Sequence, residues 1–351
     1  SKDWENPDEG SGIALYNMKT QENRSLYYSE DEHFLPVEAF FEKNGKGIIF
    51  VTAPEDPEES SFCHIYRHDL ESGQNTLIRR IQLRDVAFEC IHLIKYLEKD
   101  MYLWIPGVKN DDSLIYRRIN IFTGERQYIG ENKYVFNDGG EKFYYIEPIY
   151  EKDDDQYESF KFGEISTGRV LKERALFEVK KMHEDEEIFP VFSTPRKKNW
   201  FCYIRHNEDE TVLEVVNSKG KRINSITLPP LEESNKMMFF TTHPSAWNAS
   251  GNTLWLVLGN VGILEINIPD GCVTNLFPGA EFFFQISLSP AEDHFAFSGP
   301  GGLSIFETKS FDRRATFVPI IGSEEEGITA QPLEEVLRNF HDDEENIEVE
   351  E

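Results

Sequence analysis

The sequence lacks the motifs by which many enzymes and membrane proteins are recognised. No apolar run approaches the ~20 residues that cross a bilayer, so we expect no membrane span. There is no Gly-x-Ser-x-Gly nucleophile elbow, phosphate-binding loop, His-Glu-x-x-His or Cys-x-x-Cys. These absences exclude the corresponding hydrolase, nucleotide-binding, metallopeptidase and redox signatures, and no reaction can be read from the sequence.

Cysteine is scarce, with four among 351 residues: Cys63, Cys90, Cys202 and Cys272. They are too widely spaced for a zinc site or a redox pair and too few for a disulfide framework. Each lies in or beside an apolar run, which predicts buried, reduced thiols. A cytoplasmic location follows from that prediction, and an extracytoplasmic chain with a trimmed N-terminus is the alternative.

Basic residues are also few, with 36 Lys and Arg against 64 Asp and Glu and a formal net charge of -28. A chain of this charge repels phosphate, and phosphate contacts supply most of the affinity for nucleic acid. We therefore expect no nucleic-acid partner. A protein or peptide partner of basic character would instead be attracted over long range.

What the sequence does contain is a repeat of roughly 45 residues with four strand-like runs in each unit. The third and fourth runs form hairpins, most of which have Gly, Asn, Asp or Ser in the turn. Seven such hairpins begin at Ile13, His64, Ile115, Phe160, Leu213, Gly262 and Leu303. The first and second runs form six further pairs, which begin at Val37, Phe88, Tyr134, Phe189, Met238 and Phe283.

A repeated unit of four strands that cannot bury its faces alone is typical of a β-propeller blade. The repeat predicts an all-β, seven-bladed β-propeller over residues 1–322, with a six-bladed ring as the alternative. The first blade lacks its two inner strands, so it is either incomplete or closed by strands from both termini. The indoles of Trp104, Trp200 and Trp255 fall in second strands and are expected in the core.

The segment Ser287–Thr308, SLSPAEDHFAFSGPGGLSIFET, resembles the Ser-Pro-Asp-Gly phrase and following apolar strand of WD-repeat-like and Tol-type bacterial propellers. The Gly-His and Trp-Asp signatures of true WD repeats are absent from every unit. The resemblance implies a propeller fold and a habit of ligand binding, and a fold alone does not define a function.

Residues 323–351 are predicted to form an acidic tail outside the propeller. Its many carboxylates are opposed only by Arg338, so they should repel one another and keep the segment extended. The run PLEEVLRNF allows a short helix over residues 332–340.

The loops of the predicted propeller differ in charge according to their place in the repeat. Loops after second and fourth strands share one face of a propeller and are acidic here, whereas turns after first and third strands are mixed or basic. We expect the acidic face to bind a partner. Its candidate residues are Glu55, Asp56, Glu58, Glu59, Asp111, Asp112, Asp153, Asp154, Asp155, Glu184, Asp185, Glu186 and Asp209.

A candidate anchor for such a partner is Trp247, which lies in the turn HPSAWNASGN rather than in a predicted strand. Exposed indoles are frequent centres of binding energy at protein interfaces. The sequence therefore favours a non-catalytic platform that binds a protein or peptide and needs no cofactor.

The alternative is a metal-assisted hydrolase or lactonase with its site in the central channel of the propeller. Four polar residues of first strands could face that channel: Glu38, Glu89, His92 and His243. Carboxylate and imidazole groups that converge can hold a divalent cation and activate water. Polar side chains also line any wet channel, so the simpler interpretation is a solvated wall.

Overall fold

The computed structural model describes residues 12–17, 20, 22–28, 34–42, 44–54, 62–82, 102–108, 114–138, 142–150, 157–168, 170–183, 185–207, 209–230, 245–258, 261–278, 285–289, 294–299, 302–307, 314–319 and 330–332. All regular elements in these residues are β-strands. Nowhere in them is there a helix of the length and apolarity needed to cross a membrane.

The chain divides into two compact units. The first comprises Ser1–Phe136, Phe143–Glu147 and Glu164–Arg174, and the second comprises Asn137–Lys142, Pro148–Gly163 and Ala175–Glu351. The sheet β10-β11-β12-β13 contributes residues to both units. Its strands are β10 (Tyr134–Asn137), β11 (Phe143–Tyr150), β12 (Tyr157–Thr167) and β13 (Leu171–Lys180).

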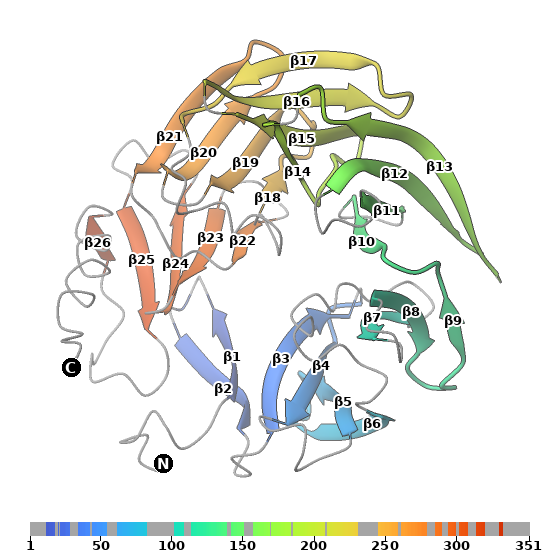
Figure 1. Ribbon diagram of the computed structural model, residues 1–351. Coiled ribbons are helices and arrows are strands. Elements are labelled where there is room, and N and C mark those ends of the chain that lie inside the picture. Colours follow the sequence, from blue (N-terminus) through green and yellow to red (C-terminus); the bar gives the residue numbers. More distant parts are fainter. Residues whose placement is uncertain are drawn as a thin grey trace, which may run out of the picture. The chain divides into compact units, whose positions relative to one another are not determined.

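Three sheets of the first unit are antiparallel (Figure 1): the described strands of the first form a hairpin, β1-β2, and the other two are meanders with orders β3-β4-β5-β6 and β7-β8-β9. The first contains β1 (Gly12–Asn17) and β2 (Glu22–Tyr28). The second contains β3 (Phe34–Phe41), β4 (Gly47–Pro54), β5 (Phe62–Asp69) and β6 (Asn75–Gln82). The third contains β7 (Tyr102–Val108), β8 (Leu114–Asn120) and β9 (Arg126–Tyr128).

Three further antiparallel meanders lie in the second unit. One contains β14 (Glu187–Pro190), β15 (Trp200–His206), β16 (Thr211–Asn217) and β17 (Arg222–Thr227). The next contains β18 (Ser245–Trp247), β19 (Thr253–Leu258), β20 (Gly262–Asn267) and β21 (Cys272–Pro278). The last contains β22 (Gln285–Leu288), β23 (His294–Gly299), β24 (Gly302–Glu307), β25 (Arg314–Pro319) and β26 (Ala330–Pro332).

Strands β14, β15 and β16 are buried on both faces, which explains their nearly continuous apolar runs, whereas the edge strand β17 is largely exposed. Cys202 and Ile204 of β15 join a core cluster with side chains of sheet β18–β21. Phe201 and Tyr203 point to the other side, where their rings lie 5.9 and 6.4 Å from that of Phe162 in β12. Neighbouring sheets of the second unit thus pack face to face.

Face-to-face packing recurs in the first unit. Val51 and Ile65 of sheet β3–β6 share a core cluster with Leu103 of β7. The opposite face of the sheet places Phe50 against Tyr27 of β2, with ring centroids 4.9 Å apart. Sheet β3–β6 is therefore covered by a neighbouring sheet on each face, as expected for repeated units that cannot fold alone.

Turns are fixed by the fourth strand of the preceding sheet. Arg79 of β6 donates from Nε to the carbonyl of Ile121, 2.7 Å away in the turn between β8 and β9. Phe177 of β13 lies against Gly220 of the β16–β17 turn, where a Cβ would approach the Phe177 Cβ to 3.0 Å. Gly220 also has a φ of 73°, which glycine adopts without the strain of other residues.

The predicted all-β fold is confirmed by these strands, and the sheet β1-β2 has two strands in the described part of the chain. The C-terminal strand β26 pairs with β25, Ala330 opposite Thr316, and not with β1 or β2. Whether the first blade is incomplete or closed by both termini stays a prediction, because residues 1–11 and 333–351 lie outside the described part of the chain. Strand β26 lies inside the segment predicted as a tail, and the helix predicted over residues 332–340 falls outside the described residues after Pro332.

The predicted burial of the thiols is only partly correct. Cys63 and Cys202 are buried, whereas Cys272 is exposed because it opens β21, an edge strand, directly after a turn. Cys90 lies outside the described residues. The reducing, cytoplasmic location inferred from these thiols stays a prediction.

Candidate functional site

Two basic turns meet at one edge of sheet β14–β17. Strand β15 begins opposite the end of β16, with Trp200 paired to Asn217. The connections 191–199 and 218–221 therefore lie at the same end of the strands, and we call this end of the sheet the turn edge. They carry Arg196, Lys197, Lys198, Lys219 and Lys221 and no acidic residue.

The connections at the other end of the strands, which we call the loop edge, are acidic. His206 at the end of β15 pairs with Thr211 at the start of β16, and Glu187 at the start of β14 pairs with His206. The connections 181–186 and 207–210, which lead into these residues, carry six acidic residues and one lysine. Charge in this sheet is therefore separated between its two edges.

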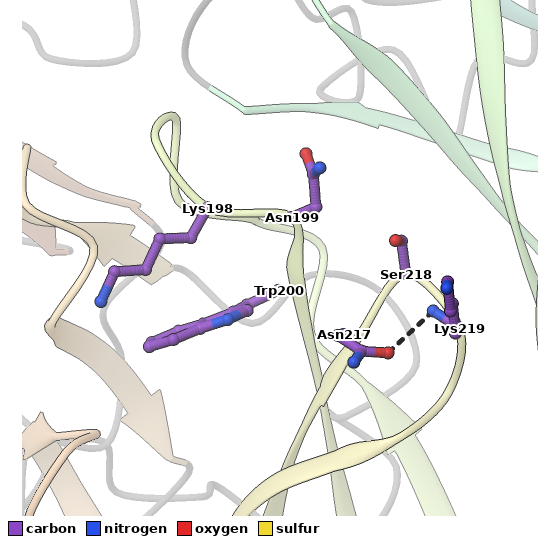
Figure 2. Close-up of a pocket in the computed structure, with 6 residues that line it drawn as sticks. All are labelled: Lys198, Asn199, Trp200, Asn217, Ser218 and Lys219. Atoms are coloured by element: carbon purple, nitrogen blue, oxygen red, sulfur yellow. Dashed lines mark hydrogen bonds between the residues drawn. The ribbon is translucent and has the colours of Figure 1, made fainter.

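A depression of about 490 Å³ opens at the turn edge. It is lined by Lys198, Asn199, Trp200, Asn217, Ser218 and Lys219. Figure 2 shows Lys198 extended over the indole of Trp200, with its Nζ 3.8 Å from the ring centroid. Partial burial lowers the pKa of Lys198. The depression thus combines an aromatic wall with a cation held against it.

The side chains around this depression are held by neighbouring turns. Lys198 donates to Oδ1 of Asn252 in the turn between β18 and β19. Lys142, at the start of β11, donates to Oδ1 of Asn199 over 3.2 Å. Three successive turns between first and second strands are thereby connected side by side within the second unit.

The second basic turn is organised by Asn217, at the end of β16. Its Oδ1 accepts the backbone N–H groups of Lys219 and Lys221 at 2.9 and 3.1 Å, as Figure 2 shows for Lys219. This local side-chain acceptor fixes the turn. The two lysines are consequently mounted on an ordered backbone, with both side chains exposed.

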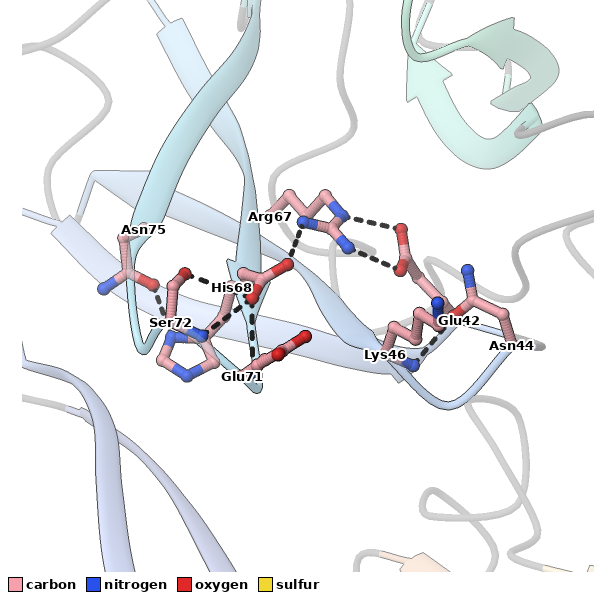
Figure 3. Close-up of polar contacts among 9 residues, drawn as sticks. Glu42, Asn44, Lys46, Arg67, His68, Glu71, Ser72 and Asn75 are labelled. Carbon is pink, nitrogen blue, oxygen red and sulfur yellow. Dashed lines mark hydrogen bonds and ion pairs between the residues drawn. The ribbon is translucent and has the colours of Figure 1, made fainter.

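None of the five turn-edge cations forms an ion pair with a carboxylate in the part of the chain that the structure describes. The corresponding edge of sheet β3–β6 is different (Figure 3). Its Arg67 donates from Nε and Nη2 to both carboxylate oxygens of Glu42, at 2.9 and 3.0 Å, and from Nη1 to Asp69 at 2.9 Å. The cation there is neutralised within its own sheet.

Asp69 has a further structural role in sheet β3–β6. Its Oδ1 accepts the N–H of Ser72 at 2.9 Å, which fixes the turn between β5 and β6. That hydrogen bond, followed by the pairing with Arg67, holds the pKa of Asp69 well below its usual range. Glu42, Arg67 and Asp69 at this edge therefore contact one another and the turn of their own sheet.

No protein-family model matches the sequence, and the search of curated proteins found no match. Solved structures do resemble the fold. An oligogalacturonate lyase in complex with manganese has a TM-score of 0.55 and 12% identity, covering 82% of this chain and 79% of that chain. The β-propeller domain of the Trilobed protease from Pyrococcus furiosus has a TM-score of 0.50 and 14% identity, covering 92% and 90%.

A chain in the crystal structure of the Mitotic Checkpoint Complex has a TM-score of 0.50 and 12% identity, covering 86% of each chain. The fold is a β-propeller. At such low identity these similarities concern the fold alone, so the function must be argued from the propeller's own residues. The choice between six and seven blades stays a prediction.

Most residues predicted for the acidic face of the propeller lie outside the described part of the chain. These are Glu55, Asp56, Glu58, Glu59, Asp111, Asp112, Asp153, Asp154, Asp155 and Glu184. Asp185 and Asp209 are described, and both are exposed at the loop edge of sheet β14–β17. Glu210, which the sequence interpretation did not single out, is exposed beside them.

Glu186 does not belong to an exposed acidic face, contrary to prediction. It is 3% exposed, and its Oε2 lies 2.7 Å from Nη1 of Arg205. The same oxygen accepts the backbone N–H of Met182 at 2.5 Å. The carboxylate is turned inward because β15 presents an arginine next to it.

Trp247 is not an exposed anchor either. Its side chain is half-buried and packs against the core cluster shared by sheets β14–β17 and β18–β21. The indole Nε1 donates to Oγ of Ser193 at 3.1 Å, and Ser193 in turn contacts Oγ of Ser245 at 2.6 Å. Both the apolar and the polar parts of Trp247 are thus used within the propeller.

Only Glu38 of the four predicted metal ligands lies in the described part of the chain. Glu89, His92 and His243 lie outside the described residues, and Glu38 is half-buried in β3 opposite Val51. Within the described part of the propeller, no group of three or more His, Cys, Asp or Glu side chains could hold a metal ion.

The sequence interpretation missed the role of Trp200. It was expected in the core with Trp104 and Trp255, which are 1% and 7% exposed, but Trp200 is only partly buried and forms a wall of the depression. The signal was present in its neighbours, because Trp200 directly follows the basic turn TPRKKN. A strand residue next to a charged turn lies at the end of the sheet, where burial is incomplete.

Proposed function

We propose that this propeller is a non-catalytic platform that binds a basic segment of a protein or peptide partner through its acidic loops. The observation that supports this function best is the separation of charge in sheet β14–β17. Asp185, Asp209 and Glu210 are exposed at the loop edge, while the lysines and the arginine of the connecting turns lie at the other edge.

Long-range electrostatic attraction would bring the basic partner to the propeller. A net charge of -28 attracts a cationic partner from any direction, and exposed carboxylates grouped at one edge give the encounter an orientation. None of Asp185, Asp209 and Glu210 is paired with a cation among the described residues. Such a surface should accelerate association more than it slows dissociation, with a strong dependence on salt.

The test is fluorescence anisotropy of a labelled Lys- and Arg-rich peptide titrated with the full chain at low and at high salt. The loop-edge variant Asp185→Asn/Asp209→Asn/Glu210→Gln should bind about tenfold more weakly at low salt. The matched control Glu71→Gln/Glu125→Gln/Asp270→Asn removes three charges from turns at the other end of the strands. Equal weakening in both variants would contradict a site at the loop edge.

A second candidate function is the metal-assisted hydrolase or lactonase. It is favoured by one observation, the fold similarity to a lyase in complex with manganese at a TM-score of 0.55. The proposed ligands are Glu38, Glu89, His92 and His243. Stabilisation by Mn²⁺ in a thermal unfolding experiment, lost with a chelator and in Glu38→Gln/His243→Ala, would support this function. An unfolding midpoint indifferent to both additions would contradict it.

A further inference from the structure

We propose that the turn edge of sheet β14–β17 is a second binding site, which takes an acidic segment of a protein partner into the depression beside Trp200. This site lies at the opposite edge of the sheet from the loop-edge surface and does not rest on it. Its ligand is a peptide with carboxylate side chains and one apolar side chain, the carboxylates facing the lysines and the apolar group facing the indole.

The first support comes from the basic side chains of the turn edge, which form no ion pair with a described carboxylate. In a chain with a net charge of -28, basic residues have acidic residues available in excess, and Arg67 uses two of them. Arg196, Lys197, Lys219 and Lys221 use none of those described. These side chains form a local cluster of positive charge in a strongly negative chain. Such a cluster can attract an anionic group of a partner.

The second support is that the site is held in place before binding. Lys198 is fixed by Asn252 and by the ring of Trp200, and Asn199 is fixed by Lys142. Asn217 orders the other turn. Side chains that are already ordered lose less conformational entropy on binding, so more of the contact free energy appears as affinity.

The third support is the shape and composition of the depression. The depression of about 490 Å³ is open to solvent, as suits a peptide segment that lies across a surface, and one wall is a partly buried indole. An indole at the centre of a charged rim is the arrangement that concentrates binding energy at protein interfaces. Ser218 and Asn199 add polar groups beside the indole.

A peptide fits this site better than a nucleic acid. A nucleic acid carries a charge on every nucleotide, and the strand beyond the depression would meet the field of a strongly anionic chain. A peptide can place two or three carboxylates at Lys198, Lys219 and Lys221 and remain neutral elsewhere. The local attraction then acts within about one Debye length, ~10 Å, without the cost of distant repulsion.

The test uses a fluorescein-labelled peptide rich in Glu with a single Phe, titrated with the full chain at low and at high salt. Binding should weaken at high salt, and Lys219→Gln/Lys221→Gln should weaken it about tenfold at low salt. The matched control Lys46→Gln/Lys172→Gln removes two exposed lysines from other sheets and should leave the affinity unchanged. Replacing Phe by Ala in the peptide should also weaken binding and reduce the change in tryptophan fluorescence.

Several outcomes would overturn this inference. One is unchanged affinity in Lys219→Gln/Lys221→Gln; another is equal loss in the control pair. A third is tighter binding of a single-stranded RNA with the same number of charges in competition with the peptide, which would show that the ligand is a nucleic acid. The loop-edge variant should bind the acidic peptide with the same affinity as the unaltered chain does. The two proposed binding sites are therefore tested independently.

Discussion

Nη1 of Arg205 lies 2.7 Å from Oε2 of Glu186, and the two side chains are only 14% and 4% exposed. Removal of one partner from a buried pair leaves an uncompensated charge. We expect Glu186→Ala and Arg205→Met each to lower the free energy of unfolding by about 3 kcal/mol. Urea unfolding of the two variants measures the loss.

The double variant Glu186→Ala/Arg205→Met should lose less than the sum of the two single losses, because no buried charge is then left alone. Glu158→Ala provides the control, since Glu158 and Lys180 are 54% and 64% exposed and 4.0 Å apart. That variant should change the unfolding free energy by less than about 1 kcal/mol. Strict additivity of the two buried substitutions would show that the pair is not coupled.

A second prediction concerns the close packing of Gly47 at the start of β4. A Cβ there would lie 2.7 Å from Oε2 of Glu42 and 2.9 Å from the backbone carbonyl oxygen of His68. Gly47→Ala should therefore lower the unfolding free energy by about 1–3 kcal/mol through overpacking. Gly168→Ala, with nothing within 4 Å of its Cβ, should be close to neutral. Equal effects of the two substitutions would contradict the packing described for Gly47.

Much of the fold could be predicted from the sequence because strand signals are local. Alternation and turn residues located hairpins such as β16–β17, and they also located the two basic turns that the register brings to one edge. Glu186 and Trp247 could not be placed in this way. Their environment depends on Arg205 and Ser193, which come from other strands and connections.

The candidate site depended on tertiary contacts even more. The contacts of Lys198 with Asn252 and of Lys142 with Asn199 join residues more than fifty positions apart. No local pattern encodes such distant pairs. The sequence indicated which turns were basic, and only the structure showed that one lysine is held against an indole.

A third prediction concerns the reactivity of the thiols. Burial raises the pKa of Cys63 to about 12, against a smaller lowering by the charge of Arg117, and burial alone raises that of Cys202. The thiolate is the reactive form, so both should resist iodoacetamide in the folded protein. The exposed Cys272 should be alkylated under the same conditions. Peptide mass spectrometry before and after unfolding in urea distinguishes the three sites, and rapid native alkylation of Cys202 would contradict its burial.

The fourth prediction is a pH dependence of stability that arises from Glu173. Its two carboxylate oxygens accept from the N–H of Gly130 at 2.7 Å and from Nζ of Lys133 at 2.6 Å. Burial by itself would raise the pKa of Glu173, but these two donors and the lysine charge outweigh it and leave the pKa below its usual value. A carboxyl with a lowered pKa in the folded state stabilises the protein when ionised. That stabilisation is present above the unfolded-state pKa of about 4.3 and is lost as the pH falls through the folded-state pKa.

Glu173→Gln should accordingly lower the free energy of unfolding by about 1 kcal/mol at neutral pH, because Gln keeps an acceptor for Gly130 but loses the attraction to Lys133. The difference between the variant and the unaltered chain should shrink as the pH is lowered from about 5 toward 3, where Glu173 itself becomes protonated. Urea unfolding at a series of pH values measures this difference. Glu71→Gln, at an exposed turn position, is the control and should give a small difference at every pH. A constant gap for Glu173→Gln across the series would mean that its effect comes from lost packing, and the ion pair would then have no part in the stability of the first unit.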